Sequence, residues 1–223
     1  MVKGFCLFLI DCIFPRKCVS CDSFTGGSLV CDTCRGRFVP AGTAGLLPGT
    51  PARQVISPFF TSAVLLDVVR FLKFEGGSAA AEWLGQGMSE VLRPYSEGLD
   101  APVIVPVPLH WTRLVRRGYD QAGLLAGVIS RDTGIPVCRK ALARKKRTKA
   151  QSSLEREERG DNMAGAFRVR SAAPLCGRDI ILVDDLVTSG ETASACCRAL
   201  DEAGPSSITI LCAGRKKSRK KLG

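Results

Sequence analysis

The feature that most constrains the fold is one stretch in which an apolar run ends on two adjacent carboxylates. The run Ile180–Val183 is followed at once by Asp184 and Asp185, then by a short polar turn and a helical pattern from Thr192 to Ala203. An apolar run without polar alternation is typical of a buried parallel strand. The carboxyl ends of such strands form the edge of a sheet where ligands bind, so the sequence predicts both aspartates at that edge.

Strands and helices alternate along the rest of the chain, which favours an α/β fold with a parallel sheet flanked by helices. The pattern predicts a strand and a short helix within residues 52–77, helices over 79–93 and 120–133, and strands over 103–108, 135–142, 166–169, 179–183 and 207–213. The helix over 79–93 is expected to stop before Pro94. Residues 143–163 are highly charged and are expected to form a long loop.

Four of the eleven cysteines form two close pairs. Cys18 and Cys21 make one C-x-x-C motif, and Cys31 and Cys34 make the second. Two such motifs offer four thiolates to one metal ion, so we predict structural zinc; a redox pair is the alternative, but no βαβ unit surrounds the motifs. The other cysteines form no further C-x-x-C motif and lie mostly in apolar segments, so the pattern indicates a reducing cytoplasm.

The first fourteen residues are mostly apolar and follow the pattern of a signal peptide in part. Asp11 interrupts the run and no cleavage site of small residues follows, so we expect a docking helix instead. Cys6 and Cys12 in this segment are either alternative metal ligands or packing residues. No apolar run in the sequence reaches the roughly 18 residues of a membrane span.

The formal net charge is +11, from 32 basic and 21 acidic residues, and it is concentrated in blocks. Such blocks attract polyphosphates, nucleic acid or acidic partners, although a solubilising tail is an equal alternative for the last residues. A platform for single-stranded nucleic acid needs interleaved aromatic residues, and only 6% of this chain is aromatic. The charge therefore leaves a nucleic-acid partner open.

The turn after the aspartates has the composition of a phosphate-binding site. Backbone N–H groups at a helix start carry partial positive charge and bind phosphate, and Gly190 permits a positive φ. Carboxylates bind sugar hydroxyls, or a metal on the same ligand, so the segment predicts a sugar phosphate. The alternative is a pair of solvated acids before a capped helix. Neither a P-loop nor a GxGxxG dinucleotide motif occurs in the sequence.

The stretch ILVDDLVTSGET resembles the motif with which type I phosphoribosyltransferases bind 5-phosphoribosyl 1-pyrophosphate (PRPP). More closely, the chain is similar to the ComF family, bacterial proteins that join a four-cysteine zinc knuckle to such a domain. The resemblance runs from Phe14 to Ala213 through FPRKCVSC, CDTC, FLKFEGG, VPVPLHWTRLVRRGYDQAGLLA, RTKAQSSLEREERGDNMAGAF and the aspartate motif. It implies an N-terminal helix and four-cysteine unit (1–40), a linker (41–56), a phosphoribosyltransferase-like domain (57–214) and a basic tail (215–223).

The resemblance also implies roles for individual residues. Asp184 and Asp185 would hold the ribose 2′- and 3′-hydroxyls, with Mg²⁺ accompanying PRPP. The 5′-phosphate would be wrapped by Thr188, Ser189, Gly190, Glu191 and Thr192. Pyrophosphate would face the loop Val105–His110, in particular Val107, Pro108, Leu109 and His110. A mobile loop would bring Arg147, Lys149 and Arg159 to the leaving pyrophosphate, or would be a solvated surface, so the predicted catalytic residues are Asp184, Asp185, Arg147 and Lys149.

Two classes of function follow from the resemblance. One is an enzyme that transfers the phosphoribosyl group of PRPP to an unknown acceptor. The other is a binding module that senses PRPP, a nucleotide or another sugar phosphate, or contacts single-stranded DNA or competence proteins in DNA uptake. The sequence leaves three nearby positions open: Lys73 is either near the phosphates or solvated, and Tyr119 and Gln121 either pack or position a ligand.

Overall fold

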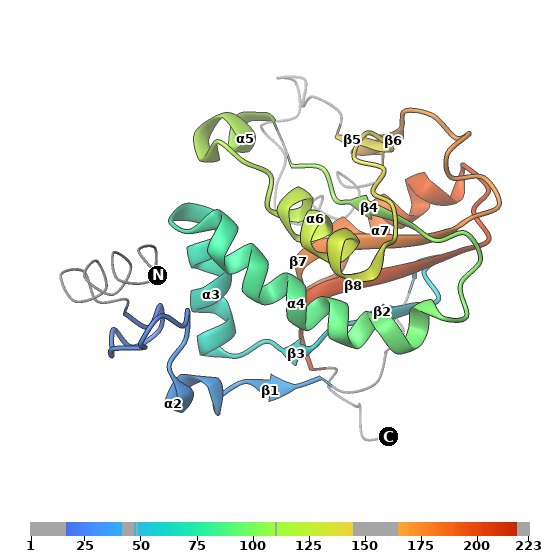
Figure 1. The fold of residues 1–223 in the computed structure, drawn as a ribbon. Helices are drawn as coiled ribbons and strands as arrows, with labels where there is room; N and C mark the ends of the chain where they lie inside the picture. The colour runs from blue at the N-terminus through green and yellow to red at the C-terminus, as the bar shows by residue number, and fades with distance from the viewer. Residues whose placement is uncertain (1–16, 42–46, 48, 110, 145–164, 218–223) are drawn as a thin grey trace, which may run out of the picture.

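A mostly parallel sheet lies between two helical layers in the computed structural model, which describes residues 17–41, 47, 49–109, 111–144 and 165–217 (Figure 1). The main sheet contains β1 (Val39–Pro40), β2 (Gln54–Ile56), β3 (Phe59–Phe60), β4 (Val103–Pro106), β7 (Asp179–Val187) and β8 (Ser207–Arg215), and β5 (Leu142–Arg144) pairs with β6 (Phe167–Val169). The helices are α2 (Asp32–Arg35), α3 (Ala63–Phe74), α4 (Gly77–Ser96), α5 (Trp111–Arg117), α6 (Gln121–Thr133) and α7 (Glu191–Asp201). No helix in these described ranges combines the length and apolarity that crossing a membrane requires.

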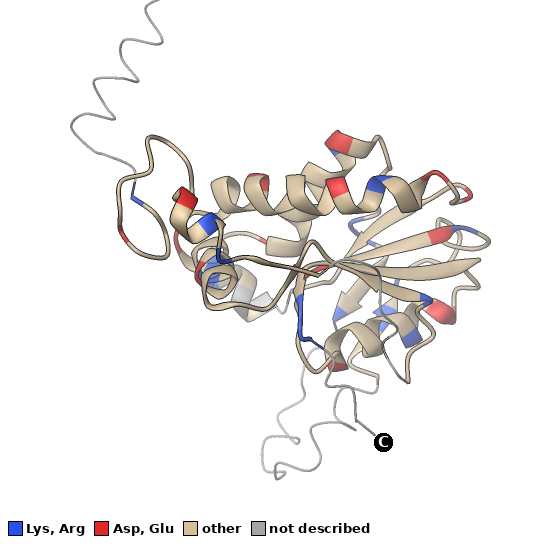
Figure 2. Cartoon of the chain, turned by 90° about the horizontal axis from the view of Figure 1, so that it is seen from below, with Lys and Arg blue, Asp and Glu red and all other residues tan. Residues whose placement is uncertain are grey.

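The strand order β1-β3-β8-β7-β4 places β7 and β8 in the centre of the sheet. Every pairing is parallel except that of β1 with β3, and β2 pairs with β8 just ahead of β3. The central strands are apolar and almost uncharged along their length, with charged residues near their ends and on the helices (Figure 2). This is the pattern of strands covered on both faces, and it confirms the predicted parallel α/β fold.

The two faces of the sheet bury different helices. Ile181 and Val183 of β7 pack with α3, α4 and α6, whereas Ile180 and Leu182 pack with α7. Successive side chains of a strand point to opposite faces, so each face receives alternate residues of the same apolar run. The alternation continues into the two aspartates, which therefore project to different sides of β7.

The four-cysteine unit packs onto α3 and α4 through aromatic and polar contacts. The ring of Phe38 lies 4.7 Å from that of Phe59 and 5.1 Å from that of Trp83, measured between centroids. The Ser20 hydroxyl donates a hydrogen bond of 2.6 Å to the carboxylate of Asp67 on α3. The unit thereby shares its core with the helices that border the candidate site.

Several details of the predicted elements were wrong. Helix α4 continues through Pro94 and ends two residues later, at Ser96, so the missing N–H of the proline affects only the last turn. The predicted strand over residues 135–142 does not form: Leu142 begins β5, and before it only Val137 bridges in parallel, to Ile104, since Pro136 has no N–H to donate to a ladder. Residues 143 and 144 of the predicted charged loop belong to β5, and its residues 145–163 lie outside the described part of the chain.

Candidate functional site

The two aspartates lie within the last part of β7 and not, as predicted, after its end. The strand continues to Val187, with Asp184 opposite Cys212 of β8. On its other side β7 loses its partner earlier, because the register of β4 ends with Pro106 opposite Val183. Beyond Val183 the strand is therefore paired on one side only, which leaves an open edge at the carboxyl end of the sheet, where ligands bind in such folds.

Asp184 has the most perturbed electrostatics of the pair. The residue keeps some exposed surface, but its carboxyl group is surrounded by protein atoms and accepts a hydrogen bond of 2.8 Å from the Asp185 N–H. Burial, with the neighbouring charges of Asp185 and Asp120, raises the pKa of Asp184 to about 8, although Lys73 acts in the opposite direction. A ligand that brings hydroxyl donors or a cation would favour the ionised carboxylate.

The predicted phosphate turn connects β7 to α7. Thr188 and Ser189 are exposed, and Gly190 precedes the helix at φ 81°, a left-handed conformation that favours glycine. Residues 186–193 and Asp184 line a hollow of about 50 Å³. The first N–H groups of α7 have no partner within the helix, so they are available to a ligand in this hollow.

Two side chains, those of Glu191 and Leu47, lie near the start of α7 beside the hollow. The Glu191 side chain is exposed, as a phosphate in the turn would require. Leu47 packs against Gly190 so closely that an added Cβ would lie 2.7 Å from its Cδ1. Leu47 is not among the residues that line the hollow.

The start of the predicted pyrophosphate loop is adjacent to the aspartates. The Val107 N–H donates to the Val183 carbonyl at 2.9 Å, which places Val107, Pro108 and Leu109 at the open edge. His110 lies outside the described residues. So do Arg147, Lys149 and Arg159, and their predicted role in catalysis stays a prediction.

Lys73, whose position the sequence did not decide, lies directly at the site. The Lys73 ammonium, at the end of α3, is 2.9 Å from the Asp185 carboxylate, and the two side chains are 26% and 15% exposed. The segment before α6 reaches the same place, since Tyr119 donates a hydrogen bond of 2.8 Å to the Leu72 carbonyl. The motifs FLKFEGG and RRGYDQ thus meet beside Asp185. The sequence of neither motif predicts this contact.

Asp120 and Gln121 add two further polar groups near the aspartate pair. Burial raises the pKa of Asp120, and its charge influences that of Asp184. Gln121 is 3% exposed and accepts a hydrogen bond of 3.0 Å from Arg117. Within the described residues, Gln121 Nε2 and Asp120 Oδ1 are buried without a hydrogen-bond partner.

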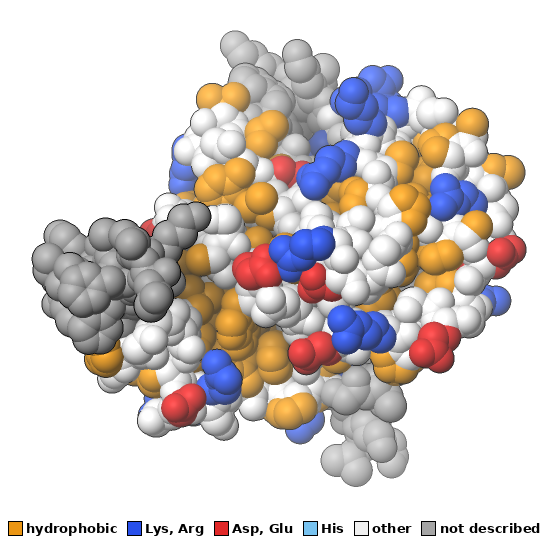
Figure 3. Space-filling model, viewed as in Figure 1, with side chains coloured by type: hydrophobic (Ala, Val, Ile, Leu, Met, Phe, Trp, Pro, Cys, Tyr) orange, Lys and Arg blue, Asp and Glu red, His pale blue; other side chains and the backbone are white. Residues whose placement is uncertain are grey.

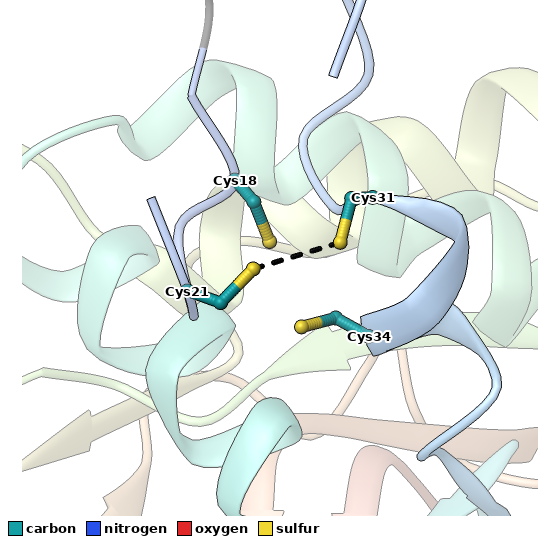
Figure 4. Close-up of side chains that lie close together, drawn as sticks. All are labelled: Cys18, Cys21, Cys31 and Cys34. Atoms are coloured by element: carbon teal, nitrogen blue, oxygen red, sulfur yellow. Dashed lines mark hydrogen bonds between the residues drawn. The ribbon is translucent and has the colours of Figure 1, made fainter. Parts of the chain in front are cut away.

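The predicted cysteine ligands converge on one point (Figure 4). The four Sγ atoms all lie within 4.8 Å of one another, and those of Cys21 and Cys31 are 3.6 Å apart. A tetrahedral zinc ion with Zn–S bonds of about 2.3 Å requires sulfur separations of roughly 3.8 Å, which this arrangement fits. The donor set can therefore hold a metal ion.

The environments of the four thiols differ. Cys18 and Cys34 are buried, and burial raises the pKa of Cys34 to about 12. The hydroxyl and backbone N–H of Ser23 lower the pKa of the exposed Cys21 to about 6. A bound cation would favour all four thiolates, including that of Cys34, which burial makes costly.

A larger cavity, of about 830 Å³, lies between the four-cysteine unit and helices α3 and α4. Its walls carry aromatic and charged side chains, among them Trp83, Phe71 and Arg70. None of the residues predicted to bind PRPP lines it.

Comparisons with known proteins agree with this architecture. The family model described as "Phosphoribosyl transferase domain" matches residues 115–222. The chain is 33% identical over 165 residues to DNA utilization protein YhgH of Escherichia coli, covering 73% of this chain and 72% of that protein. Competence protein F of Haemophilus influenzae is 36% identical over 108 residues, which are 48% of this chain and about half, 47%, of the relative. Competence protein ComFC of Bacillus subtilis is 33% identical over 113 residues, 49% of this chain and 44% of that protein.

Among solved structures, the allosteric regulatory enzyme of purine biosynthesis aligns with a TM-score of 0.42 at 16% identity, over 61% of this chain and 26% of that one. A parallel sheet that presents paired aspartates, a turn and a helix start at its carboxyl edge defines a phosphoribosyltransferase-type α/β protein, here carrying a four-cysteine unit. The chain belongs to the ComF family.

Proposed function

We propose that the protein binds PRPP together with Mg²⁺ and transfers the phosphoribosyl group to an acceptor that is still to be identified. The observation that carries the proposal is the hollow where Asp184 meets residues 186–193 at the start of α7. A diol and a phosphate joined by a ribose ring match the two kinds of group that this hollow combines.

Each part of the site would contribute to holding the ligand. Asp184 and Asp185 would accept hydrogen bonds from the ribose hydroxyls, and the N–H groups of residues 190–193 would hold the 5′-phosphate. Pyrophosphate would extend along the open edge toward Val107. Departure of pyrophosphate would leave positive charge on the ribose. Water would attack this species, so exclusion of water during transfer would be essential.

The metal ions in the proposal have different roles. Among the residues that the structure describes, the four cysteines are the group of close metal ligands, and no third acid completes a cage around the aspartate pair. Mg²⁺ would therefore be held through substrate oxygens, as this ion prefers. Zinc in the cysteine cluster would be structural, since four thiolates leave no open position for chemistry.

Calorimetry tests the binding step directly. Wild-type protein titrated with PRPP and Mg²⁺ should give a saturable heat, and Asp184→Asn combined with Asp185→Asn should abolish it. Asp201→Asn, at the far end of α7, is the matched control and should bind as wild type does. Absence of binding to the zinc-loaded wild-type protein would reject the proposal.

Turnover is a separate measurement. Pyrophosphate release should appear when nucleobases, amines or ammonia are supplied with PRPP and Mg²⁺, and Asp185→Asn should abolish that release. Binding without release for every acceptor would leave the protein as a sensor of PRPP and would rule out the transferase activity with these acceptors.

A nucleic-acid-binding role is the second candidate. Relatives named for competence and DNA utilization, the net charge of +11 and the 52% exposed ring of Phe74 with Arg117 4.9 Å away favour it. On the face in Figure 3, however, basic side chains are scattered among acidic ones. Affinity for a single-stranded oligonucleotide should fall steeply with salt and should weaken in Arg116→Ala; binding that ignores salt would exclude this role.

We also place the protein in the cytoplasm. Nine cysteines in the described part of the chain are free thiols, and four of them are the proposed zinc ligands. A reducing compartment would keep both groups in this state.

A further inference from the structure

The contact between Lys73 and Asp185 joins the proposed site to α3, a helix that the proposed chemistry leaves without a role. Lys73 belongs to the last turn of α3, and its ammonium lies 2.9 Å from Asp185 Oδ2. Both side chains are largely shielded, so the pair is less screened than one at the surface. Such a pair can hold a carboxylate in one orientation.

The end of α3 is itself held in place by the segment that precedes α6. Tyr119 donates its hydroxyl hydrogen bond to the carbonyl of Leu72, the residue before Lys73. The Tyr119 ring lies where a Cβ on Gly77 would be only 2.6 Å away, so the ring fits here because residue 77 is glycine. The Arg117 guanidinium lies 4.9 Å from the centre of the Phe74 ring. These contacts fix the backbone from which Lys73 reaches Asp185.

The acidic groups around the Lys73–Asp185 ion pair indicate what the pair does. Asp184 and Asp185 on β7 and Asp120 before α6 are close enough to influence one another. Lys73 supplies positive charge from the third element, α3. Without it, the repulsion between the charges of the two adjacent carboxylates would be less compensated.

We propose that Lys73 is a positioning residue that holds the Asp185 carboxylate, through an ion pair, in the orientation in which it receives the ligand diol. The inference rests on the proposed sugar-phosphate site and adds to it. Lys73 acts through Asp185 and does not touch the phosphates. Tyr119 supports Lys73 by fixing the carbonyl of Leu72.

The choice of ligands separates this role from direct phosphate binding. Ribose 5-phosphate carries the diol and the 5′-phosphate but no pyrophosphate, whereas PRPP carries all three. Lys73→Met should weaken the binding of both ligands by the same factor, about tenfold, as expected for the loss of one charge-assisted hydrogen bond. A larger loss for PRPP with Mg²⁺ than for ribose 5-phosphate, or no loss for either, would overturn the proposal.

Two further variants distinguish the ion pair from general damage. Lys73→Arg keeps the charge and should recover most of the affinity. Arg70→Met removes an exposed cation one turn earlier on α3 and should bind both ligands as wild type does. Equal loss in Lys73→Arg and Lys73→Met would show that the charge is not what matters.

A double-mutant cycle tests the support from Tyr119. Tyr119→Phe removes the hydrogen bond to the Leu72 carbonyl. It should lower the affinity for ribose 5-phosphate by a smaller factor than Lys73→Met does. In the Lys73→Met background the same change should cause no further loss, because the two residues act in one chain of contacts. Fully additive losses would contradict that chain.

Carboxyl NMR of the unliganded protein provides a readout that needs no ligand. Lys73→Met should move the titration of Asp184 to higher pH, since Lys73 lowers the pKa of that carboxyl. Arg70→Met should leave it unchanged. If wild type binds neither ligand yet the titration moves, the sugar-phosphate site is wrong while the ion pair stands; an unmoved titration rejects the role of Lys73.

Discussion

Replacing Asp184 by asparagine should stabilise the folded protein, and more so at pH 8 than at pH 5. The carboxyl group of Asp184 is surrounded by protein and lies within the influence of the charges of Asp185 and Asp120; burial and these charges raise its pKa from 3.8 to about 8. Asparagine has the same shape and keeps an oxygen that can accept the 2.8 Å hydrogen bond from the Asp185 N–H. The substitution therefore removes the cost of ionising a buried carboxyl group and changes little else.

The sign and size of the effect follow from proton binding. In the unfolded chain this aspartate ionises near pH 4, whereas in the folded protein it keeps its proton up to about pH 8. Between these values the folded state binds more protons, so rising pH destabilises it, by about 1.4 kcal/mol per pH unit. From pH 5 to pH 8 the cost reaches about 4 kcal/mol at most, and sharing of the proton with Asp185 lowers it toward roughly 2 kcal/mol.

Thermal unfolding at the two pH values measures this difference. About 2–4 kcal/mol corresponds to a gain in Tm of roughly 5–15 °C for Asp184→Asn over wild type at pH 8, with a clearly smaller gain at pH 5. Asp201→Asn, an exposed aspartate at the end of α7, should show no such pH dependence. A gain of equal size at both pH values, or a loss at pH 8, would refute the assignment of a buried, protonated carboxyl to Asp184.

Two other predictions concern the metal unit and the helix packing. Cys34→Ser should abolish zinc binding, measured by metal analysis of the purified protein, and should lower the Tm, whereas Cys176→Ser, which removes an exposed cysteine outside the cluster, should do neither. Gly85→Ala should cost about 1–3 kcal/mol in urea unfolding, because its Cβ would lie 2.6 Å from Val128 across the α4–α6 contact, and Val128→Ala in the same chain should recover part of that loss.

The fold could be predicted from the sequence because its central strands are buried on both faces. The runs at the centres of β4, β7 and β8 are mostly apolar, and no amphipathic alternative competes with a parallel strand there. The apolar run around Val137 was misread for a physical reason. Its Pro136 interrupts the ladder, and a run with a single parallel bridge to Ile104 looks the same in sequence as a full strand.

The candidate site could be predicted only where its residues are neighbours in the chain. Asp184 and the turn up to Thr192 form one continuous segment, so the order strand, acid, turn and helix carried the prediction. Lys73 reaches Asp185, and Tyr119 reaches Leu72, by packing between segments that are far apart in sequence. Nothing in the local pattern of either segment distinguishes these residues from solvated ones.

The placement of Asp184 also explains why the site is costly for the unliganded fold. Beyond Val183 the strand has lost β4, so the carboxylates lie where the sheet offers a partner on one side only. A chain selected for stability alone would place apolar or solvated residues at such an edge, as the apolar remainder of β7 illustrates. Keeping two acids there costs free energy that Lys73 only partly offsets, whereas a ligand that donates hydroxyl groups would recover much of that cost on binding. The unfavourable electrostatics of the empty edge and the affinity for a sugar phosphate would then have one physical origin.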